Sequence, residues 1–309
     1  MRDSIRLTFK MHRFELVALT AFAAFLVVGA FWVAGQLDAV GYGPCAMDRG
    51  PVPANCESLG YRWYRIQESQ ASPIFGFLTI LPFVTGVFLG GPLIAREIER
   101  GTTRLAWSLG SSRLRWYISR MLPIILAVLA VAFAAGVAAD RLTAAVSPNV
   151  DIANAFDSFG QRGVLVAITA LVMAAGAIGL GAVTGRVLPT VILALVLGTL
   201  GITGVTKLHD EFTAGEAILV EGEYVGRGDR YVDQFFRLPD GRLVDWNGLA
   251  EFDPKAMTGE SAPSYPIVSL VIPGSRYREV ETRQAVLLGG IALVMLAGTA
   301  VVVQRRRPG

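Results

Sequence analysis

The sequence predicts an all-α polytopic membrane protein with six transmembrane helices and a small β-containing extracytoplasmic lobe between the fifth and sixth helices. The first observation is composition: the 309 residues are 53% hydrophobic with a mean hydropathy of +0.50, which is too apolar for a soluble domain of this length. The second is a set of six apolar stretches, each long enough to cross about 30 Å of hydrocarbon at roughly 20 residues per helix. The third is the polar stretch 207–284, which separates the last two of them.

The six apolar stretches are each expected to form one membrane helix. They are residues 14–35, 73–95, 121–139, 163–185, 187–206 and 285–303. The first is too long for the apolar core of a cleaved signal and is followed by no convincing small-residue cleavage site. Only Arg186 and Pro189 interrupt the run between the fourth and fifth stretches, so this division rests on the least sequence evidence.

The distribution of charge predicts the orientation. With the N-terminus inside, the inner segments 1–13, 96–120 and 304–309 together with Arg186 carry 14 of the 28 Lys and Arg residues in a small share of the chain. The outer segments hold 21 of the 25 acids. Because short cytoplasmic loops are enriched in Lys and Arg, we expect both termini to lie in the cytosol.

Residues 1–13 precede the first span and mix basic residues with apolar ones. Ile5 and Phe9 share one stripe at helical spacing, which predicts a short interfacial helix with its basic side facing anionic headgroups. An ordinary positive flank that only fixes the topology explains the pattern equally well.

The first outer loop contains the only two cysteines, Cys45 and Cys56, which are 11 positions apart. A disulfide suits an oxidising face of the membrane. Two free thiols are the alternative, and zinc is disfavoured because no histidine or third cysteine is near. The Gly and Pro content of "GYGPCAMDRGPVPANCESLGYRWYRIQ" predicts turns rather than a regular element, with the aromatic stretch 59–66 resting on the membrane surface.

The 207–284 segment is expected to form the β-containing lobe. Pro239, Asp240 and Gly241 form a turn signal inside "RLPDGRL". The apolar stretch 265–273, "YPIVSLVIP", is too short to span, so it either dips into the outer leaflet or packs under the lobe.

Small residues on the spans predict close helix packing rather than a site. Gly86 and Gly90 lie four positions apart in the second span, and Gly181 and Gly185 do so in the fourth. GxxxG pairs of this kind let helix backbones approach closely.

Several kinds of chemistry have no signature in the sequence. None of the three lysines follows a glycine, so no nucleotide-binding P-loop exists, and His12 and His209 are expected on opposite faces of the membrane. The spans are nearly free of charge; Glu15 lies at the edge of the first span, where Arg13 can neutralise it. We therefore expect no catalytic residue, metal site or cofactor in this chain, and the net charge of +3 indicates no nucleic-acid partner.

The 96–120 segment is the most unusual part of the chain. It holds six arginines and only two acids, and it is longer than a connector between antiparallel helices needs to be. Gly101 is expected to break the first helix and Thr102–Thr103 to cap a new one, with Ser111 or Ser112 capping the return into the membrane. Trp116 and Tyr117 are expected at headgroup level. The apolar middle of the segment would be exposed unless it docks on a cytosolic partner or lies on lipid, and both interpretations remain open.

The stretch 90–123, "GGPLIAREIERGTTRLAWSLGSSRLRWYISRMLP", resembles the permease subunits of ABC-2 type transporters, particularly actinobacterial ones. In these proteins a segment of the form A-R-E-x-E-x-G-T-x-R-L-A-W, then a Ser/Arg turn and R-W, links the second and third spans. The matching residues are Ala95, Arg96, Glu97, Glu99, Gly101, Thr102, Arg104, Leu105, Ala106, Trp107, Arg115 and Trp116. The six-span layout extends the resemblance over most of the chain, whereas the 207–284 lobe is longer than is usual in that family.

The resemblance implies an ABC-2 (type V exporter) fold in a bacterial plasma membrane. It implies a second permease half, identical or related, and a separate cytosolic ABC ATPase that binds ATP and Mg²⁺. The 96–120 segment would be the coupling helix. Glu97 and Glu99 would meet basic or amide groups of the ATPase, and Arg100 and Arg104 acidic ones. The full set of implied coupling residues is Arg96, Glu97, Glu99, Arg100, Gly101, Thr102, Arg104, Leu105 and Trp107, in which Gly101 allows the bend and Leu105 and Trp107 fill an apolar socket.

The second and fifth spans usually line the translocation path in that family. This would place Phe75, Thr79, Phe83 and Phe88 near the cargo. An uncharged path fits an amphiphilic cargo, such as a drug-like compound, a lipid or a peptide. The resulting division is an N-terminal segment 1–13, spans 14–206, the lobe 207–284 and a last span with a basic tail 285–309.

Two other classes of function remain open. A membrane-embedded enzyme is disfavoured by the lack of polar residues within the spans. A non-transporting sensor or scaffold that binds a ligand through the 207–284 lobe is the main alternative to an exporter subunit.

Overall fold

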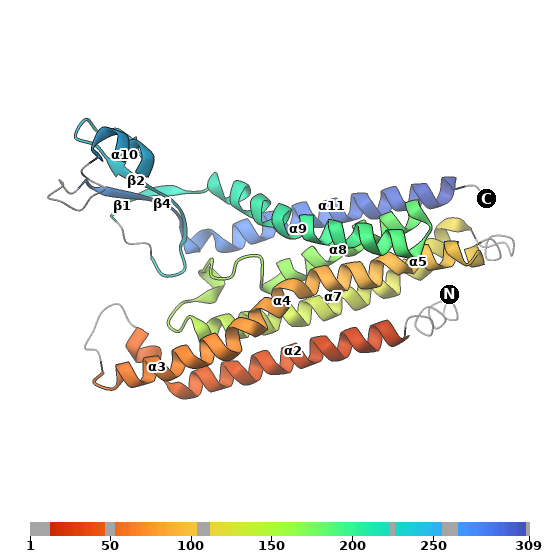
Figure 1. Ribbon diagram of the computed structural model, residues 1–309, viewed down its shortest axis with the longest axis horizontal. Coiled ribbons are helices and arrows are strands. Elements are labelled where there is room, and N and C mark those ends of the chain that lie inside the picture. The colour runs from red at the N-terminus through yellow and green to blue at the C-terminus, as the bar shows by residue number, and fades with distance from the viewer. Residues whose placement is uncertain (1–12, 47–52, 104–111, 223–225, 255–264, 307–309) are drawn as a thin grey trace. The chain divides into compact units, whose positions relative to one another are not determined.

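The computed structural model describes residues 13–46, 53–103, 112–222, 226–254 and 265–306 (Figure 1). The chain divides into two compact units. The helical unit comprises Met1–Asn149, Ser158–Lys207 and Glu281–Gly309, and the second unit comprises Val150–Asp157 and Leu208–Val280. The predicted interfacial helix at 1–13 lies outside the described residues except for Arg13.

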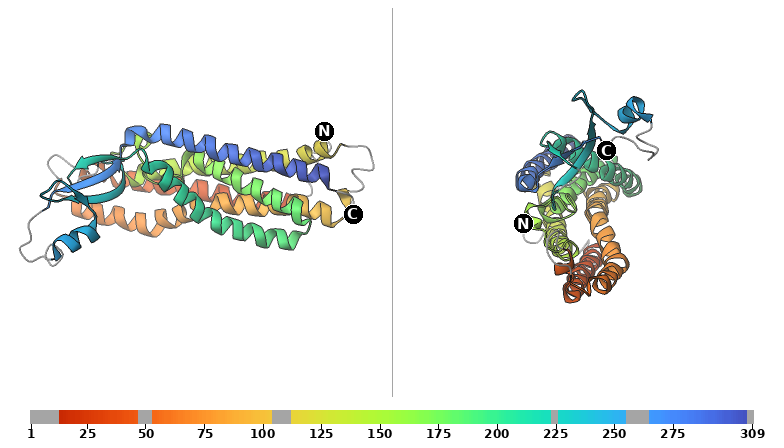
Figure 2. Two further views of the ribbon diagram at one scale, coloured as in Figure 1. Left: turned by 90° about the horizontal axis from the view of Figure 1, so that it is seen from above. Right: turned by 90° about the vertical axis from the view of Figure 1, so that its left-hand side faces the viewer.

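Long helices dominate the helical unit and run alongside one another (Figures 1 and 2). They are α2 (Arg13–Val40), the uninterrupted series α3 (Cys56–Ile66), η2 (Gln67–Ala71), α4 (Ser72–Thr85), η3 (Gly86–Gly90) and α5 (Gly91–Glu99), then α7 (Arg113–Val146), α8 (Gly163–Thr184), α9 (Val187–Ala214) and α11 (Tyr277–Arg305). Short 3₁₀ turns form η1 (Gly43–Ala46), η4 (Ile152–Asn154) and η6 (Gly274–Arg276). Each of the six predicted apolar stretches therefore falls on a helix.

Five helices in the described part of the chain are long and apolar enough to cross a membrane. They are Arg13–Val40, Cys56–Glu99, Arg113–Val146, Gly163–Thr184 and Gly274–Arg305. The apolar part of α9, Val187–Gly201, is shorter than the others. The protein is thus mostly helical with several membrane-spanning helices, and the sixth span stays a prediction.

The helix Cys56–Ile66 contradicts the prediction of turns in the first outer loop. The Gly and Pro residues that suggested turns lie before Cys56, except for Gly60 inside the helix, and the helix is anchored by packing. Trp63 stacks on Tyr42 with ring centroids 5.1 Å apart, and Trp63 and Ile66 pack against the buried cluster formed by α2, α4 and α7. Partial burial of these side chains stabilises a helix that local composition did not indicate.

Glycines bring the second helical series and α8 into backbone contact. A Cβ atom at Gly86 would lie 2.7 Å from the backbone nitrogen of Ala174, and one at Gly90 would lie 2.8 Å from the Ala174 carbonyl oxygen. A Cβ atom at Gly181 would lie 2.8 Å from the carbonyl oxygen of Gly91. The predicted packing role of these three glycines is confirmed. Gly185 differs, because it ends α8 in the left-handed conformation at φ +62°.

The second unit is built on a four-stranded antiparallel sheet in the order β1-β4-β2-β3. The strands are β1 (Ile218–Glu221), β2 (Arg230–Arg237), β3 (Leu243–Val244) and β4 (Ile267–Ile272), accompanied by the helix α10 (Trp246–Phe252). The predicted turn at Pro239–Gly241 is confirmed, since Gly241 has φ +87° and its N–H donates to the Leu238 carbonyl.

The stretch 265–273 was expected to dip into the membrane or to pack under the lobe. It instead supplies β4, which pairs with both β1 and β2 and is buried at Val268, Val271 and Ile272. A short apolar run bounded by prolines reads equally well as a fully buried inner strand. Residues 150–157 also belong to this unit, through the Phe156 N–H that donates to the Gly228 carbonyl and the Phe156 ring that lies 5.5 Å from that of Tyr277.

Candidate functional site

The 96–120 segment lies where several helix ends meet, at the right-hand end of the helices in Figure 1. The structure describes this segment from Arg96 to Thr103 and from Ser112 to Arg120. Polar contacts join it to the ends of α2, α9 and α11 and join α5 to α7 within it, and Arg306, which follows α11, donates to Ala182 near the end of α8. The site is therefore a junction of helix ends, and its geometry follows from the hydrogen bonds and ion pairs made at each end.

The end of α5 is shaped by Gly101, as predicted. The N–H of Arg100 donates to the Arg96 carbonyl, and the N–H of Gly101, at φ +70°, donates to that of Ile98. The hydroxyl of Thr102 donates to the Glu97 carbonyl at 3.0 Å, so it satisfies a carbonyl of the outgoing helix. Ser112 then caps α7, because its hydroxyl accepts the N–H of Arg115 at 3.3 Å, which confirms the predicted restart.

Two ion pairs fix the end of α5 against neighbouring helices. Glu97 pairs with Arg120 of α7 at 3.0 Å, and only 5% and 12% of the two side chains are exposed. Arg96 pairs with Glu15 at the start of α2 at 2.9 Å. Because removing one member of a buried pair leaves an uncompensated charge, the Glu97–Arg120 pair defines the relative position of α5 and α7.

Glu99 connects the same end of α5 to α9. Its Oε2 accepts the backbone N–H of Val187, the first residue of α9, at 2.9 Å. The first N–H groups of a helix have no partner within the helix and carry the positive end of its dipole, which favours a carboxylate there. Glu99 thus caps a helix that begins 88 positions later.

Arg113 and Arg306 secure the end of α11. One guanidinium nitrogen of Arg113 donates to the carbonyl oxygens of Gln304 and Arg306, at 2.7 Å each. Arg306 in turn donates to the carbonyl of Ala182 near the end of α8. Cations are favoured at helix C-termini, where carbonyl groups lack intrahelical partners.

The structure gives most of the predicted coupling residues contacts within the chain. Glu97 is buried, and Arg96, Glu99 and Thr102 bond to neighbouring elements as described above, whereas Arg100 is exposed. Arg104, Leu105 and Trp107 lie outside the described residues. Contact of any of these residues with an ATPase stays a prediction.

The expectation that Trp116 and Tyr117 face lipid headgroups is wrong. They are only 5% and 2% exposed and belong to the buried cluster that includes Leu93 and Ile94. The Tyr117 hydroxyl donates to the Leu296 carbonyl at 3.1 Å, and an internal partner of this kind lets a tyrosine bury its ring.

Sequence reasoning missed Arg113, Arg120 and Arg306 as parts of this junction. Their partners lie far away in the chain, 191 positions for Arg113 and Gln304 and 124 for Arg306 and Ala182. Local spacing carries no signal at such separations. The only hint was the excess of arginine over acid in the 96–120 segment, since carbonyl groups can take up cations as carboxylates do.

The four residues predicted for the translocation path do not share one surface. Phe83 is 8% exposed and packs with Met173 and Leu288, whereas Phe88 is 51% exposed. Phe75 packs against the cluster of α2 and α7, and the hydroxyl of Thr79 donates to the Phe75 carbonyl at 2.9 Å and to Oε1 of Gln161 at 3.2 Å. Their role in a path stays untested.

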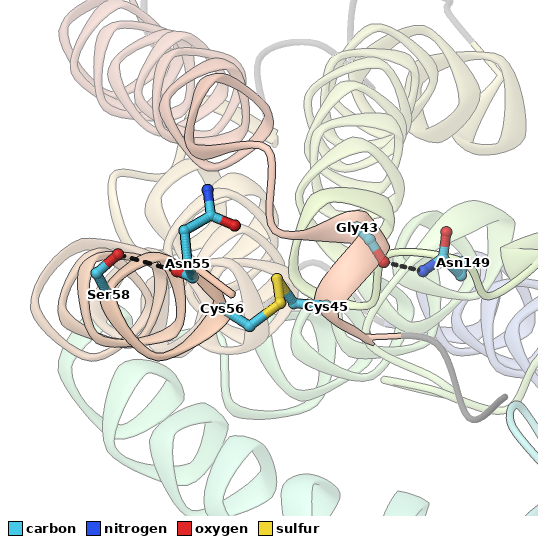
Figure 3. Close-up of a disulfide and its surroundings, with 6 residues drawn as sticks. All are labelled: Gly43, Cys45, Asn55, Cys56, Ser58 and Asn149. Atoms are coloured by element: carbon cyan, nitrogen blue, oxygen red, sulfur yellow. Dashed lines mark hydrogen bonds between the residues drawn. A yellow bond between two sulfur atoms is a disulfide. The ribbon is translucent and has the colours of Figure 1, made fainter. Parts of the chain in front are cut away.

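The predicted disulfide between Cys45 and Cys56 is confirmed. It joins the turn after α2 to the first residue of α3, with the two Cα atoms 5.4 Å apart (Figure 3). Asn149, which follows α7, donates from its side chain to the Gly43 carbonyl at 2.5 Å beside this bridge. In the part of the chain that the structure describes, no cluster of His, Cys, Asp or Glu could hold a metal ion.

Several long apolar helices, joined at one end by a charged junction, define a multi-pass membrane protein. Residues 16–208 match the family described as ABC-2 membrane transporter related. That match covers more than half of the chain, so the protein belongs to this family. The comparisons found no match among curated proteins or solved structures.

Proposed function

We propose that the protein is the membrane-spanning permease subunit of an ATP-driven exporter, which moves an amphiphilic cargo and draws energy from a separate cytosolic ATPase docked at the 96–120 segment. Membership of the ABC-2 related family supports a transport role in the bilayer alongside an ATPase. Members of such families are typically non-catalytic, and ATP and Mg²⁺ would bind the partner chain.

The observation that carries this proposal is that some charged residues of the segment bond within the chain while others are exposed. Glu97, Glu99, Arg113 and Arg120 bond within the chain and tie the segment to several helices. Arg100 and Arg115 are exposed at the two sides of the bend. A segment that is firmly anchored to its helices and presents cations outward is suited to receive force from an acidic surface.

This arrangement changes the roles that the family resemblance suggested. Glu97 is too deeply buried to contact a partner, so in this proposal it positions the segment through Arg120. Arg100 and Arg115 take the contacts with acidic groups of the ATPase. Leu105 and Trp107 retain their proposed place in an apolar socket.

The proposed mechanism needs no charge inside the spans. ATP binding would bring two ATPase subunits together, each would push one 96–120 segment, and the two permease halves would rearrange to open outward. An apolar cargo path fits molecules that already partition into lipid, because charged groups are costly at the bilayer centre.

Co-purification tests the proposal directly. The tagged chain is extracted in mild detergent and its partners are identified by mass spectrometry. We expect an ABC ATPase to accompany the unaltered chain, and the Arg100→Glu/Arg115→Glu variant to recover at least about fivefold less of it, because each reversal repels an acidic surface. The matched control is Arg65→Glu, an exposed arginine of α3 at the far end of the same helical series. Equal recovery with both variants would contradict docking at this segment.

A sensor or scaffold that binds a ligand through the 207–284 region is the second candidate. It is favoured by one observation, that this region forms a compact unit with its own sheet and its own buried cluster of Phe236, Leu238 and Leu249. The same co-purification separates the two candidates, because a sensor requires no ATPase.

A further inference from the structure

The 96–120 segment is covalently continuous with α5 and α7 only, yet it also bonds to α2, through the pair of Arg96 with Glu15, and to the backbone of α9 and α11. Glu99 accepts the N–H of Val187 at the start of α9, and Arg113 donates to the carbonyls of Gln304 and Arg306 at the end of α11. Both bonds join a charged side chain to the backbone of a helix terminus, where backbone groups lack intrahelical partners. Bonds of this kind are stronger than those between neutral groups.

The corner that Glu99 reaches is itself rigid. Gly185 turns the chain at φ +62°, and the hydroxyl of Thr190 donates to the Arg186 carbonyl at 2.6 Å. The hydroxyls of Thr184 and Thr190 lie 2.5 Å apart across the turn. A displacement applied at Val187 therefore moves the end of α8 and the start of α9 together.

Packing complements the hydrogen bond at this corner. A Cβ atom at Gly185 would lie 2.9 Å from Cγ2 of Ile98, so α5 and the corner are in close contact. The contact between Ile98 and Gly185 resists compression, and the bond from Val187 to Glu99 resists separation. Movement of the end of α5 toward or away from this corner is thus transmitted to the corner between α8 and α9.

We propose that Glu99 is a positioning residue that transmits displacement of the 96–120 segment to α9, one of the two helices expected to line the translocation path. Arg113 makes the corresponding connection to α11. The inference rests on the proposed function, because it concerns where force from an ATPase goes once it has reached the segment. It differs from the role that the family resemblance implied for Glu99, which was contact with the ATPase itself.

Hydrogen exchange with mass spectrometry tests this link in the complete assembly. The chain and its co-purified ATPase are placed in lipid nanodiscs, with and without ATP and vanadate. Peptides covering 96–103 report on the segment, and peptides covering 187–194 report on the start of α9. In the unaltered protein we expect nucleotide trapping to change exchange in both peptides.

The variants separate the hydrogen bond from a general effect on folding. Without nucleotide, Glu99→Ala should raise exchange at the start of α9 about fivefold, the usual effect of losing a capping acceptor. With trapped nucleotide, Glu99→Ala should respond at 96–103 and no longer at 187–194. Glu99→Gln should restore the response, because the amide oxygen accepts the same N–H. Glu68→Ala, an exposed glutamate in η2 of the same helical series, is the matched control and should behave like the unaltered protein.

The outcomes distinguish this inference from the proposed function. If 96–103 fails to respond in the unaltered protein, the docking proposal fails and the inference with it. If both peptides still respond in Glu99→Ala, the docking proposal stands and the role of Glu99 is refuted. Failure of Glu99→Gln to restore the response also counts against the hydrogen bond as the link.

Discussion

Glu97 and Arg120 form a deeply buried ion pair, with only 5% and 12% of the two side chains exposed. Burying such a pair costs desolvation, whereas removing one partner leaves the other as an uncompensated buried charge. Here it holds α5 against α7 two residues before α5 ends at Glu99. The side chains that hold the junction together are therefore distinct from those that face outward.

The first prediction concerns this pair. Glu97→Ala should destabilise the protein by about 3 kcal/mol, because it strands a buried guanidinium. The double variant Glu97→Ala/Arg120→Leu should recover much of that loss. Thermal unfolding in detergent measures both. Glu221→Ala, which breaks an exposed pair with Arg237, should cost less than about 1 kcal/mol. A double variant no more stable than Glu97→Ala would contradict the stated cause.

The second prediction compares two glycines with positive φ. Gly101→Ala should cost about 1 kcal/mol, because a Cβ atom there is strained but meets no atom within 4 Å. Gly185→Ala should cost about 2 kcal/mol or more, since its Cβ atom would also meet Ile98 and Arg306. Thermal unfolding in detergent compares the two variants. Equal losses of stability would mean that the contacts of the added Cβ atom at position 185 contribute nothing.

At the scale of elements, the helical series from Cys56 to Glu99 shows what the sequence could and could not indicate. Hydropathy correctly predicted the apolar part at 73–95, but not the helical residues before it, because the stretch 56–72 is largely polar. In the structure Pro73 follows the π-helical turn η2, and Pro92 likewise follows η3. A proline lacks the N–H that would bond one turn back, and a widened turn before it lets the helix continue.

The candidate site was only partly predictable for a different reason. The break at Gly101 and the cap at Ser112 follow from local conformational preferences, so the sequence indicated them. The bonds from Glu99 to Val187 and from Arg113 to Gln304 join residues 88 and 191 positions apart. No periodicity or spacing reports on such pairs. The proposed role of the segment came from resemblance to a family, which no local pattern supplies.

The third prediction concerns the disulfide at the start of α3. Replacing both cysteines, as Cys45→Ser/Cys56→Ser, should lower stability by about 2–3 kcal/mol, because the open loop gains freedom mainly in the unfolded state. In the unaltered protein, reductant should lower the stability measured by thermal melting by the same amount. In the variant, reductant should have no effect on the stability. Mass spectrometry without reductant should find one linked peptide, and two alkylated thiols would refute the bridge.

At the scale of the whole molecule, the chain combines a helical unit with a second unit assembled from two separate segments. The sequence indicated the β-containing region after the fifth apolar stretch, but not that residues 150–157 belong to it. That association depends on contacts with Gly228 and Tyr277, which lie far away in the chain.

The fourth prediction concerns the topology of the chain. In a Cys45→Ser/Cys56→Ser background, single cysteines are placed at the exposed positions Arg100, Asp240 and Arg305. If there are six spans, a membrane-impermeant maleimide should label Asp240→Cys on intact cells, and label Arg100→Cys and Arg305→Cys only after permeabilisation. Labelling of Arg305→Cys on intact cells would indicate an odd number of spans.

The glycine contacts along α8 limit how the helical unit can change shape. At Gly86, Gly90 and Gly181 even one added methyl group would collide with the backbone of the neighbouring helix. Two helices in such close backbone contact cannot slide past each other without first separating. We therefore expect them to move as one rigid body. Mutations that favour or block movement of the helices should then accumulate at the borders of that rigid body. Selection for functional variants should leave these three glycines unchanged.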